Sequence, residues 1–155
     1  MLENHLRIFV GAVNDMLTQL GVGEIDEGMY TCPESAFEQR DLLVIIGLVR
    51  DIRGRIIYRL SSDLAMSITS SMLGGISVDT IDDMANSAIC EFANMVSGMA
   101  VSMFPSGIIV DITPPTLVSG QELTISVGRS DILMNKINTS FGFISVYLAL
   151  DVKPQ

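Results

Sequence analysis

An uninterrupted apolar run, LLVIIGLV at residues 42–49, is the feature of this sequence that most constrains its fold. The run has only eight residues, whereas a helix that crosses a membrane needs about 20. A short run of this kind is typical of a strand that is buried inside a sheet. We therefore expect a buried, central strand at this position, and no membrane insertion.

Further strands are expected on both sides of this run. RIIYRL at 55–60 has the β-branched and aromatic composition of a strand, and a tight turn at Arg53-Gly54 would join it to the apolar run. EGMYTC at 27–32 is a candidate short strand. Four more β-rich segments are separated by Gly, Pro, Asn and Ser, and they predict a β-meander. These segments are 107–120, 121–128, 131–138 and 141–150.

Two helices are predicted from apolar spacing and from terminal residues. Apolar residues recur at spacings of three and four from Leu6 to Leu20, which predicts an amphipathic helix over about 2–20, closed by Gly21. A shorter helix, LAMSITSSMLG at 64–74, follows the strand pair. The residues that can cap or end this shorter helix are Ser61, Ser62, Asp63, Gly74 and Gly75.

The longest predicted helix follows, capped by Asp79 or Thr80 and running to about Met103, where the proline and glycine of FPSG end it. Strands thus occur in two blocks, each after a long helix, without the regular β-α alternation of a doubly wound fold. The chain is 48% hydrophobic, which is ample material for a core. We predict one α+β domain over 1–155, with long helices packed on an antiparallel sheet.

Charge and cysteine usage restrict the partners and the compartment. A formal net charge of −9 opposes binding to nucleic acid or to anionic lipid, so protein or small-molecule partners are favoured. Cys32 and Cys90 lie in different segments without CxxC spacing, as expected for buried thiols in a reducing compartment. The N-terminal segment has no signal-peptide pattern. We expect a cytoplasmic protein.

The sequence does not indicate a metal site. A single histidine and no clustered thiols argue against zinc or another soft metal. Asp82 and Asp83 suggest a hard cation, but adjacent side chains diverge in the first turn of a helix, where acids favour the helix dipole. We favour this dipole role for both residues.

Two stripes of side chains are predicted along the longest helix at about 100° per residue. The stripe expected to face the core comprises Met84, Ala88, Phe92, Met95 and Met99. A narrow second stripe, turned toward solvent, comprises Ser87, Glu91, Asn94 and Gly98. Gly98 costs about 1 kcal/mol of helix stability relative to alanine, so its place there invites a reason such as the close approach of another backbone.

The polar stripe has an unusual setting. Ser, Glu and Asn occur on many surface helices, so their spacing alone is weak support for a function. However, no lysine or arginine occurs anywhere from 76 to 128, whereas ordinary solvated helix faces pair Glu with Lys. We therefore interpret this face as a contact surface.

These residues resemble the motif of the CheC/CheX/FliY chemotaxis phosphatases. Members carry an Asp or Ser, a Glu after three further residues, an Asn after two more, and a proline some twenty residues beyond. Ser87, Glu91 and Asn94 match in order, with Pro114 or Pro115 as the proline. Pro115 follows Asn94 after twenty intervening residues, slightly short of the commonest family spacing. SSMLGG before the helix and ITPPTLVSG after it are similar to the CheX branch.

The resemblance implies a homodimer that removes phosphate from the phosphoaspartate of CheY-like receiver domains. It implies no cofactor of the chain's own, because the receiver supplies Mg²⁺. CheC-type members carry the motif on both long helices, whereas here the first helix has Asn14 but Gly11 in place of the glutamate. A single active helix fits the CheX branch.

Chemistry suggests separate roles for the two main residues. Asn94 has both a donor and an acceptor in its amide, so it can orient the attacking water. Glu91 is anionic like the phosphate, so it is expected to pair with the receiver's lysine and dock the helix. Ser87 and Pro115 are secondary, the first tuning the contact and the second stiffening a loop, and Gly98 leaves Asn94 accessible.

Two other functions fit the sequence. The first is a non-catalytic dimeric module that binds receivers or flagellar-switch proteins, although the presence of both motif residues argues against it. The second is a small-ligand sensor with a pocket between helices and sheet, for which no convergent polar cluster is visible.

Overall fold

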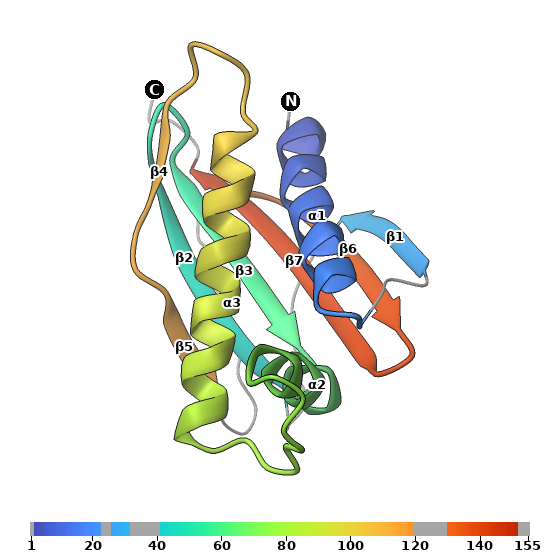
Figure 1. The fold of residues 1–155 in the computed structure, drawn as a ribbon. Coiled ribbons are helices and arrows are strands. Elements are labelled where there is room, and N and C mark those ends of the chain that lie inside the picture. Colours follow the sequence, from blue (N-terminus) through green and yellow to red (C-terminus); the bar gives the residue numbers. More distant parts are fainter. Residues whose placement is uncertain (1, 23–25, 32–40, 120–129, 152–155) are drawn as a thin grey trace.

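The computed structural model describes residues 2–22, 26–31, 41–119 and 130–151, which contain three helices and seven strands (Figure 1). The elements are α1 (Leu2–Gln19), β1 (Asp26–Thr31), β2 (Leu42–Arg50), β3 (Gly54–Leu60), α2 (Ser62–Met72), α3 (Asp83–Ser102), β4 (Val110–Ile112), β5 (Thr116–Ser119), β6 (Ser130–Thr139) and β7 (Gly142–Asp151). The predicted α+β class is confirmed.

The described strands form one sheet in the order β1-β6-β7-β3-β2-β4, and β5 pairs with β2 beside β4. Every neighbouring pair is antiparallel, as predicted. The apolar run forms β2, which is buried along most of its length. It is an interior strand rather than the central one, because β3 and β7 occupy the middle of the sheet.

The predicted meander is only partly correct. β6 and β7 form a hairpin with continuous register from Ser130–Asp151 to Thr139–Gly142, but 107–120 is not a single strand. It contains β4 and β5, which both pair with β2, one at its C-terminal end and the other at its N-terminal end. Segment 121–128 lies outside the described residues.

The break between β4 and β5 occurs where Thr113 lies against Gly47 of β2. The Thr113 backbone N–H donates to the Gly47 carbonyl at 2.9 Å, and the Gly47 N–H donates to Thr113 Oγ1 at 2.8 Å. A Cβ on Gly47 would lie 2.9 Å from Thr113 Cγ2, closer than carbon atoms normally pack. Glycine at this position therefore allows the loop that carries Pro114 and Pro115 to cross the edge of the sheet.

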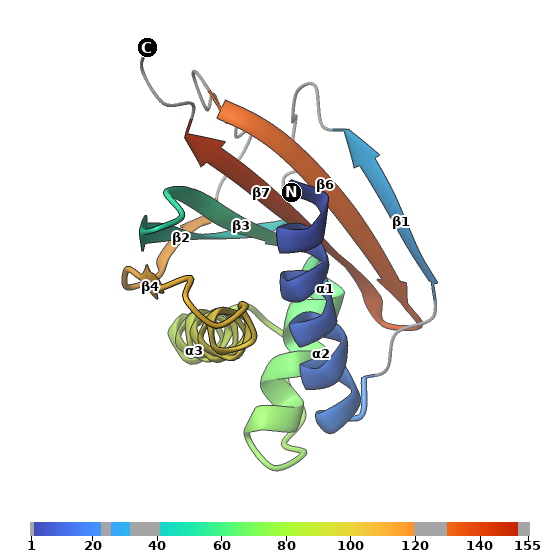
Figure 2. The same cartoon turned by 90° about the horizontal axis from the view of Figure 1, so that it is seen from above.

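All three helices cover the same face of the sheet (Figure 2). α1 lies over β6 and β7, and α2 also contacts β7. α3 lies over β2. The main hydrophobic core fills the space between these helices and the sheet. A smaller apolar cluster of Leu43, Ile57 and Tyr147 occupies the opposite face.

The ends of α1 and α2 agree with the sequence predictions. Gly21, just after α1, and Gly74 and Gly75, just after α2, all have positive φ, which glycine adopts at little cost. Ser61 is the N-cap of α2, and its hydroxyl accepts a hydrogen bond from Leu64 N at 3.3 Å.

Candidate functional site

The N terminus of α3 is capped by Asp82, whose Oδ1 accepts a hydrogen bond from Ala85 N at 2.9 Å. The predicted caps, Asp79 and Thr80, were therefore wrong, because the loop after α2 continues past them. Asp83 occupies the first turn of α3, where its charge is favourable to the helix dipole. Among the described residues, no group of three His, Cys, Asp or Glu side chains is arranged to hold a metal ion.

The core face of α3 differs from the predicted one. The buried residues are Ala85, Ile89, Phe92, Ala93, Val96, Ser97 and Ala100. Phe92 is buried as predicted, but Met84 is 60% exposed, and Met95 and Met99 are only partly buried at the margin of the core. Three alanines occupy the centre of the contact because they let the helix lie close to the sheet, while the methionines flank it. The prediction misjudged the rotation of the helix by about one residue step.

A buried hydrogen bond accompanies this rotation. Tyr58 of β3 and Ser97 of α3 are both fully buried, and their hydroxyl oxygens are 2.7 Å apart. Burial raises the pKa of Tyr58, so the phenol stays protonated. Because an unpaired buried hydroxyl is costly, the bond favours the rotation that points the opposite side of α3 to solvent.

The predicted polar row, Ser87, Glu91, Asn94 and Gly98, lies on that outward side. Ser87 and Glu91 are exposed, whereas Asn94 and Gly98 are half-buried. A Cβ added to Gly98 would have no atom within 4 Å, so the backbone approach suggested for this glycine is not made within the described structure. No other element of the described structure therefore packs against α3 at Gly98.

An open groove of about 340 Å³ runs beside the row. It is lined by Asn86, Ser87, Cys90, Glu91, Asn94 and Pro115. Of the two candidate prolines, Pro115 borders the groove and Pro114 is exposed outside its lining. The contact between Thr113 and Gly47 holds this loop at the sheet edge, two residues before Pro115. The groove thus has one wall from α3 and another from the loop.

Asn86 and Cys90 line the groove but were not predicted. Asn86 lies two turns before Asn94, at i−8, and Cys90 lies one turn before it, at i−4, so helical spacing from Asn94 could have identified them. The Asn86 Oδ1 atom is buried without a hydrogen-bond partner in the described structure. Burial raises the pKa of the half-buried Cys90 thiol, which disfavours the reactive thiolate. Cys32 lies outside the described residues.

The groove can present an anion and an amide to a partner. The side chains of Glu91 and Asn94 form no hydrogen bond or ion pair with another described residue. Glu91 also has no neighbouring cation in the sequence, because 76–128 contains no lysine or arginine. An exposed carboxylate without a counter-ion attracts a basic group, while the Asn94 amide can hold a water molecule through its donor or its acceptor.

Comparison with known proteins gives a consistent set of matches. Residues 42–138 match the family model described as chemotaxis phosphatase CheX. The CheY-P phosphatase CheX of Thermotoga maritima is 44% identical over 85 residues, covering 54% of this chain and 55% of that protein. The chain thus matches about half the length of this curated relative. None of the helices in the described part of the chain has the length and apolar character that a membrane span requires.

Solved structures share the fold over almost the whole chain. The chemotaxis protein CheX from Desulfovibrio desulfuricans has a TM-score of 0.84 at 23% identity, with 96% of this chain and 99% of that chain covered. A CheX-CheY-BeF₃-Mg²⁺ complex from Borrelia burgdorferi has a TM-score of 0.76 at 24% identity, with 96% and 98% covered. The helices and the antiparallel sheet therefore have the same arrangement in all three chains.

Proposed function

The chain belongs to the CheX family of chemotaxis phosphatases, and on this premise we propose that it hydrolyses the aspartyl phosphate of a CheY-like receiver domain. The observation that carries the proposal is the outward face of α3, where Glu91 and Asn94 border an open groove without partners among the described residues. The name of the Thermotoga relative, a CheY-P phosphatase, supports the reaction. The Borrelia complex, in which a CheX protein is bound to CheY, supports the partner.

Asn94 is the residue that we assign to the attacking water. An acyl phosphate is already reactive, so a phosphatase gains most by holding water in line with the phosphorus. The Asn94 amide can do this without a change of protonation. Its half-buried position beside Pro115 restricts the side chain and therefore favours a fixed orientation of the water.

Glu91 is assigned to docking. Its carboxylate and the phosphoryl group are both anionic, so direct approach between them is unfavourable. Pairing with a lysine next to the receiver's phosphoaspartate would neutralise Glu91 and bring Asn94, one turn further along the helix, to the phosphoryl group. Ser87, one turn earlier, would adjust this contact. Gly98 would leave room for the receiver beyond Asn94, and Pro115 would stiffen the opposite wall.

The proposal needs no cofactor bound by this chain, because the receiver would supply the Mg²⁺ beside its phosphoaspartate. It places the protein in the cytoplasm with its substrate. We also propose a homodimer formed through strand edges, since unpaired edges favour such pairing and this arrangement leaves α3 free. Light scattering that detects only monomers at micromolar concentration would contradict the dimer.

The catalytic test is the loss of phosphate from phosphorylated receivers with and without the protein. Asn94→Ala should reduce turnover by roughly 30- to 10³-fold, equivalent to about 2–4 kcal/mol, by analogy with other single catalytic hydrogen-bonding groups. Binding of a receiver loaded with BeF₃⁻ and Mg²⁺ should persist. Asn4→Ala, at an exposed asparagine of α1, is the matched control and should leave both quantities unchanged.

Glu91 should give a different result. Glu91→Ala should weaken receiver binding as well as turnover, Glu91→Gln should be intermediate, and added salt should lower the wild-type affinity. Glu3→Ala, at an exposed glutamate of α1, is the control. Wild-type turnover by Asn94→Ala would overturn the mechanism. A wild-type protein that binds receivers without accelerating phosphate loss would instead be a non-catalytic binding module.

A further inference from the structure

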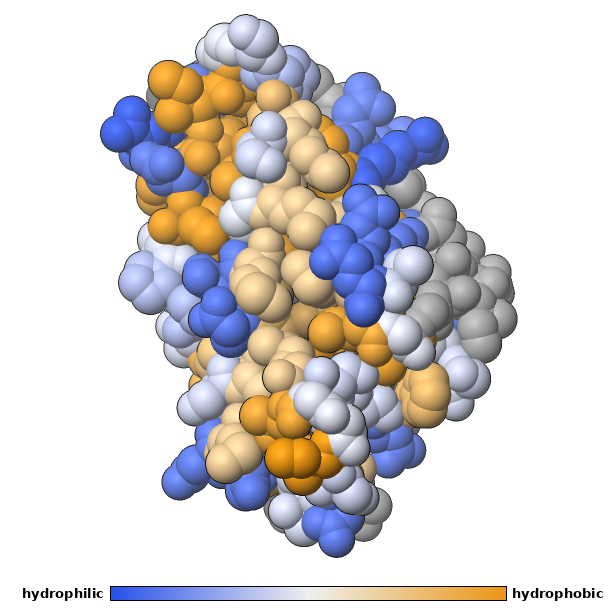
Figure 3. All heavy atoms as spheres, viewed as in Figure 1, coloured by the Kyte–Doolittle hydropathy of each residue, from blue (hydrophilic) through white to orange (hydrophobic). Residues whose placement is uncertain are grey.

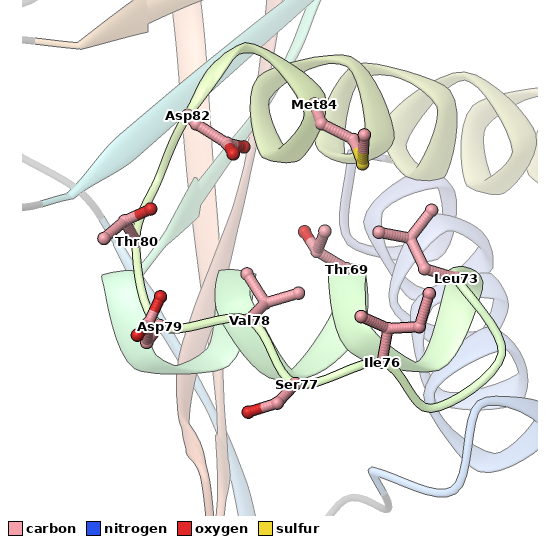
Figure 4. Close-up of a pocket in the computed structure, with 9 residues that line it drawn as sticks. All are labelled: Thr69, Leu73, Ile76, Ser77, Val78, Asp79, Thr80, Asp82 and Met84. Carbon is pink, nitrogen blue, oxygen red and sulfur yellow. The ribbon is translucent and has the colours of Figure 1, made fainter.

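A second hollow, of about 220 Å³, lies at the N-terminal end of α3 (Figure 4). It is enclosed by α2, the first turn of α3 and the loop that joins them. Its lining residues are Thr69, Leu73, Ile76, Ser77, Val78, Asp79, Thr80, Asp82 and Met84. In Figure 4 the side chains of Ile76 and Val78 point into the space from the loop, and Met84 points into it from α3. The hollow is large enough for one side chain.

Two of the apolar side chains that line the hollow are unusually exposed to solvent. Ile76 is 64% exposed and Met84 is 60% exposed, which places both among the most exposed large hydrophobic residues of the described structure. Figure 3 shows pale hydrophobic colour along the surface of α3 and a more strongly hydrophobic area at its lower end, near α2. Exposed apolar surface of this kind is typical of a contact site.

The hollow and the polar row lie along the same helix, α3. Met84 precedes Glu91 by seven residues, or two helical turns, so the two side chains project from the same side of α3, about 10 Å apart along its axis. A standard protein interface buries about 800 Å² on each partner. A domain docked on Glu91 and Asn94 would therefore also cover Met84.

The rim of the hollow is acidic. Asp79 and Asp82 line it and are exposed, Asp83 is exposed next to Asp82 in the sequence, and no basic residue occurs within 76–128. Asp82 uses one carboxylate oxygen to cap α3. The charge of this rim has the same sign as that of Glu91, so a partner with basic groups on its facing surface would be complementary to the rim and to Glu91 together.

We propose that this hollow is the second docking point for the receiver domain, accepting an apolar side chain that is flanked by basic residues. The inference rests on the proposed function and explains how the protein would select one receiver among several. Glu91 and Asn94 would recognise features common to phosphorylated receivers. Ile76, Met84 and the acidic rim would distinguish one receiver from another. An apolar anchor in a pocket beside a charged rim contributes strongly to affinity and discrimination. Its contribution is to binding rather than to the chemical step.

The test introduces a charge into the hollow. Met84→Lys and Ile76→Lys should raise the KM for the phosphorylated receiver that the wild type dephosphorylates fastest by about tenfold, with kcat within about twofold, because a positive charge opposes both the apolar anchor and its basic flanking residues. The Kd for that receiver loaded with BeF₃⁻ and Mg²⁺ should rise equally. Both positions are largely exposed, so folding should be preserved in either variant.

Matched controls are available elsewhere on the chain. Met103→Lys and Ile109→Lys change residues that are 49% and 55% exposed at the opposite end of α3 and beyond it, and they should leave KM and Kd unchanged. Asp79→Asn should give a smaller rise in Kd and a weaker dependence of Kd on salt.

The outcomes separate this inference from the proposed function. If the wild type accelerates phosphate loss but both hollow variants keep the wild-type KM and Kd, the hollow is not a docking point and the phosphatase activity stands. If the wild type releases no phosphate but binds the BeF₃⁻-loaded receiver, the activity fails, and a higher Kd in the hollow variants still supports the docking site. A wild type that neither binds nor dephosphorylates any receiver overturns both.

Discussion

The two long helices, α1 and α3, cover the same face of the sheet but are built differently. The buried residues of α1 are Leu6, Phe9, Val10, Ala12, Val13, Met16 and Leu17. Those of α3 include three alanines and a serine that is hydrogen-bonded to Tyr58. α1 therefore contributes bulk to the core, whereas α3 packs closely with small side chains and a specific polar contact. The comparison indicates that α1 mainly stabilises the fold and α3 is held in a defined rotation.

The solvent-facing sides of α1 and α3 also differ. α3 presents Glu91 and Asn94 beside the groove bordered by Pro115. On α1, Gly11 stands three residues before the half-buried Asn14, where the motif requires glutamate. A helix whose rotation is fixed can hold a side chain in a set direction, which water placement demands. The helix that adds bulk has no such requirement.

The largest expected effect tests the structural role of α1. Phe9 is fully buried, so Phe9→Ala should lower the free energy of unfolding by about 3–5 kcal/mol through lost burial and a residual cavity. Urea denaturation would measure this. Phe141→Ala, at a phenylalanine that is 46% exposed, is the control. If the folded fraction of Phe9→Ala also lost turnover as Asn94→Ala should, α1 would belong to the catalytic apparatus and the comparison would fail.

An intermediate effect tests the rotation of α3. Ser97→Ala leaves the Tyr58 hydroxyl buried without its partner, so the free energy of unfolding should fall by about 1–3 kcal/mol. Tyr58→Phe combined with Ser97→Ala should recover part of that loss, because both polar groups are then removed. Thermal or urea unfolding of the two single variants and the double variant gives the coupling. Ser102→Ala, at an exposed serine of the same helix, is the control. Additive losses would show that the hydrogen bond does not hold α3.

The smallest effect sharpens the contrast between the outward faces. Gly11→Glu restores the motif spacing on α1, and a Cβ there would meet no atom within 4 Å. Replacing glycine inside a helix should raise the free energy of unfolding by at most about 1 kcal/mol. Turnover by the Gly11→Glu, Asn94→Ala double variant should remain as low as in Asn94→Ala, because the loop with Pro115 lies against α3. Restored phosphate loss would instead make α1 a second active helix.

Elements with strong local signals were predictable from the sequence. The glycines after α1 and α2, the Ser61 cap and the apolar run of β2 all act within a few residues, so their positions were correct. The core face of α3 was wrong because hydrophobicity favoured Met84 over small residues. Close packing against a sheet selects alanine by volume, and this requirement depends on the sheet rather than on the helix.

The parts of the candidate site that depend on local spacing were also predictable from the sequence. Helical spacing placed Ser87, Glu91 and Asn94 on one side of α3, as observed, and the family resemblance supplied their proposed roles. The choice between Pro114 and Pro115 depended on where the chain leaves β4. That point is set by pairing with β2, more than sixty residues earlier in the sequence, and no local pattern contains such information.

The contact between Thr113 and Gly47 has a consequence for how the sequence can diverge. Any other residue at 47 introduces a Cβ only 2.9 Å from Thr113 Cγ2, and relief of that clash would displace the chain leading to Pro115. Gly47 does not line the groove, yet mutations at this position would alter the shape of the groove. During neutral drift, positions 47 and 113 should change together, with a side chain gained at one compensated by a smaller side chain at the other.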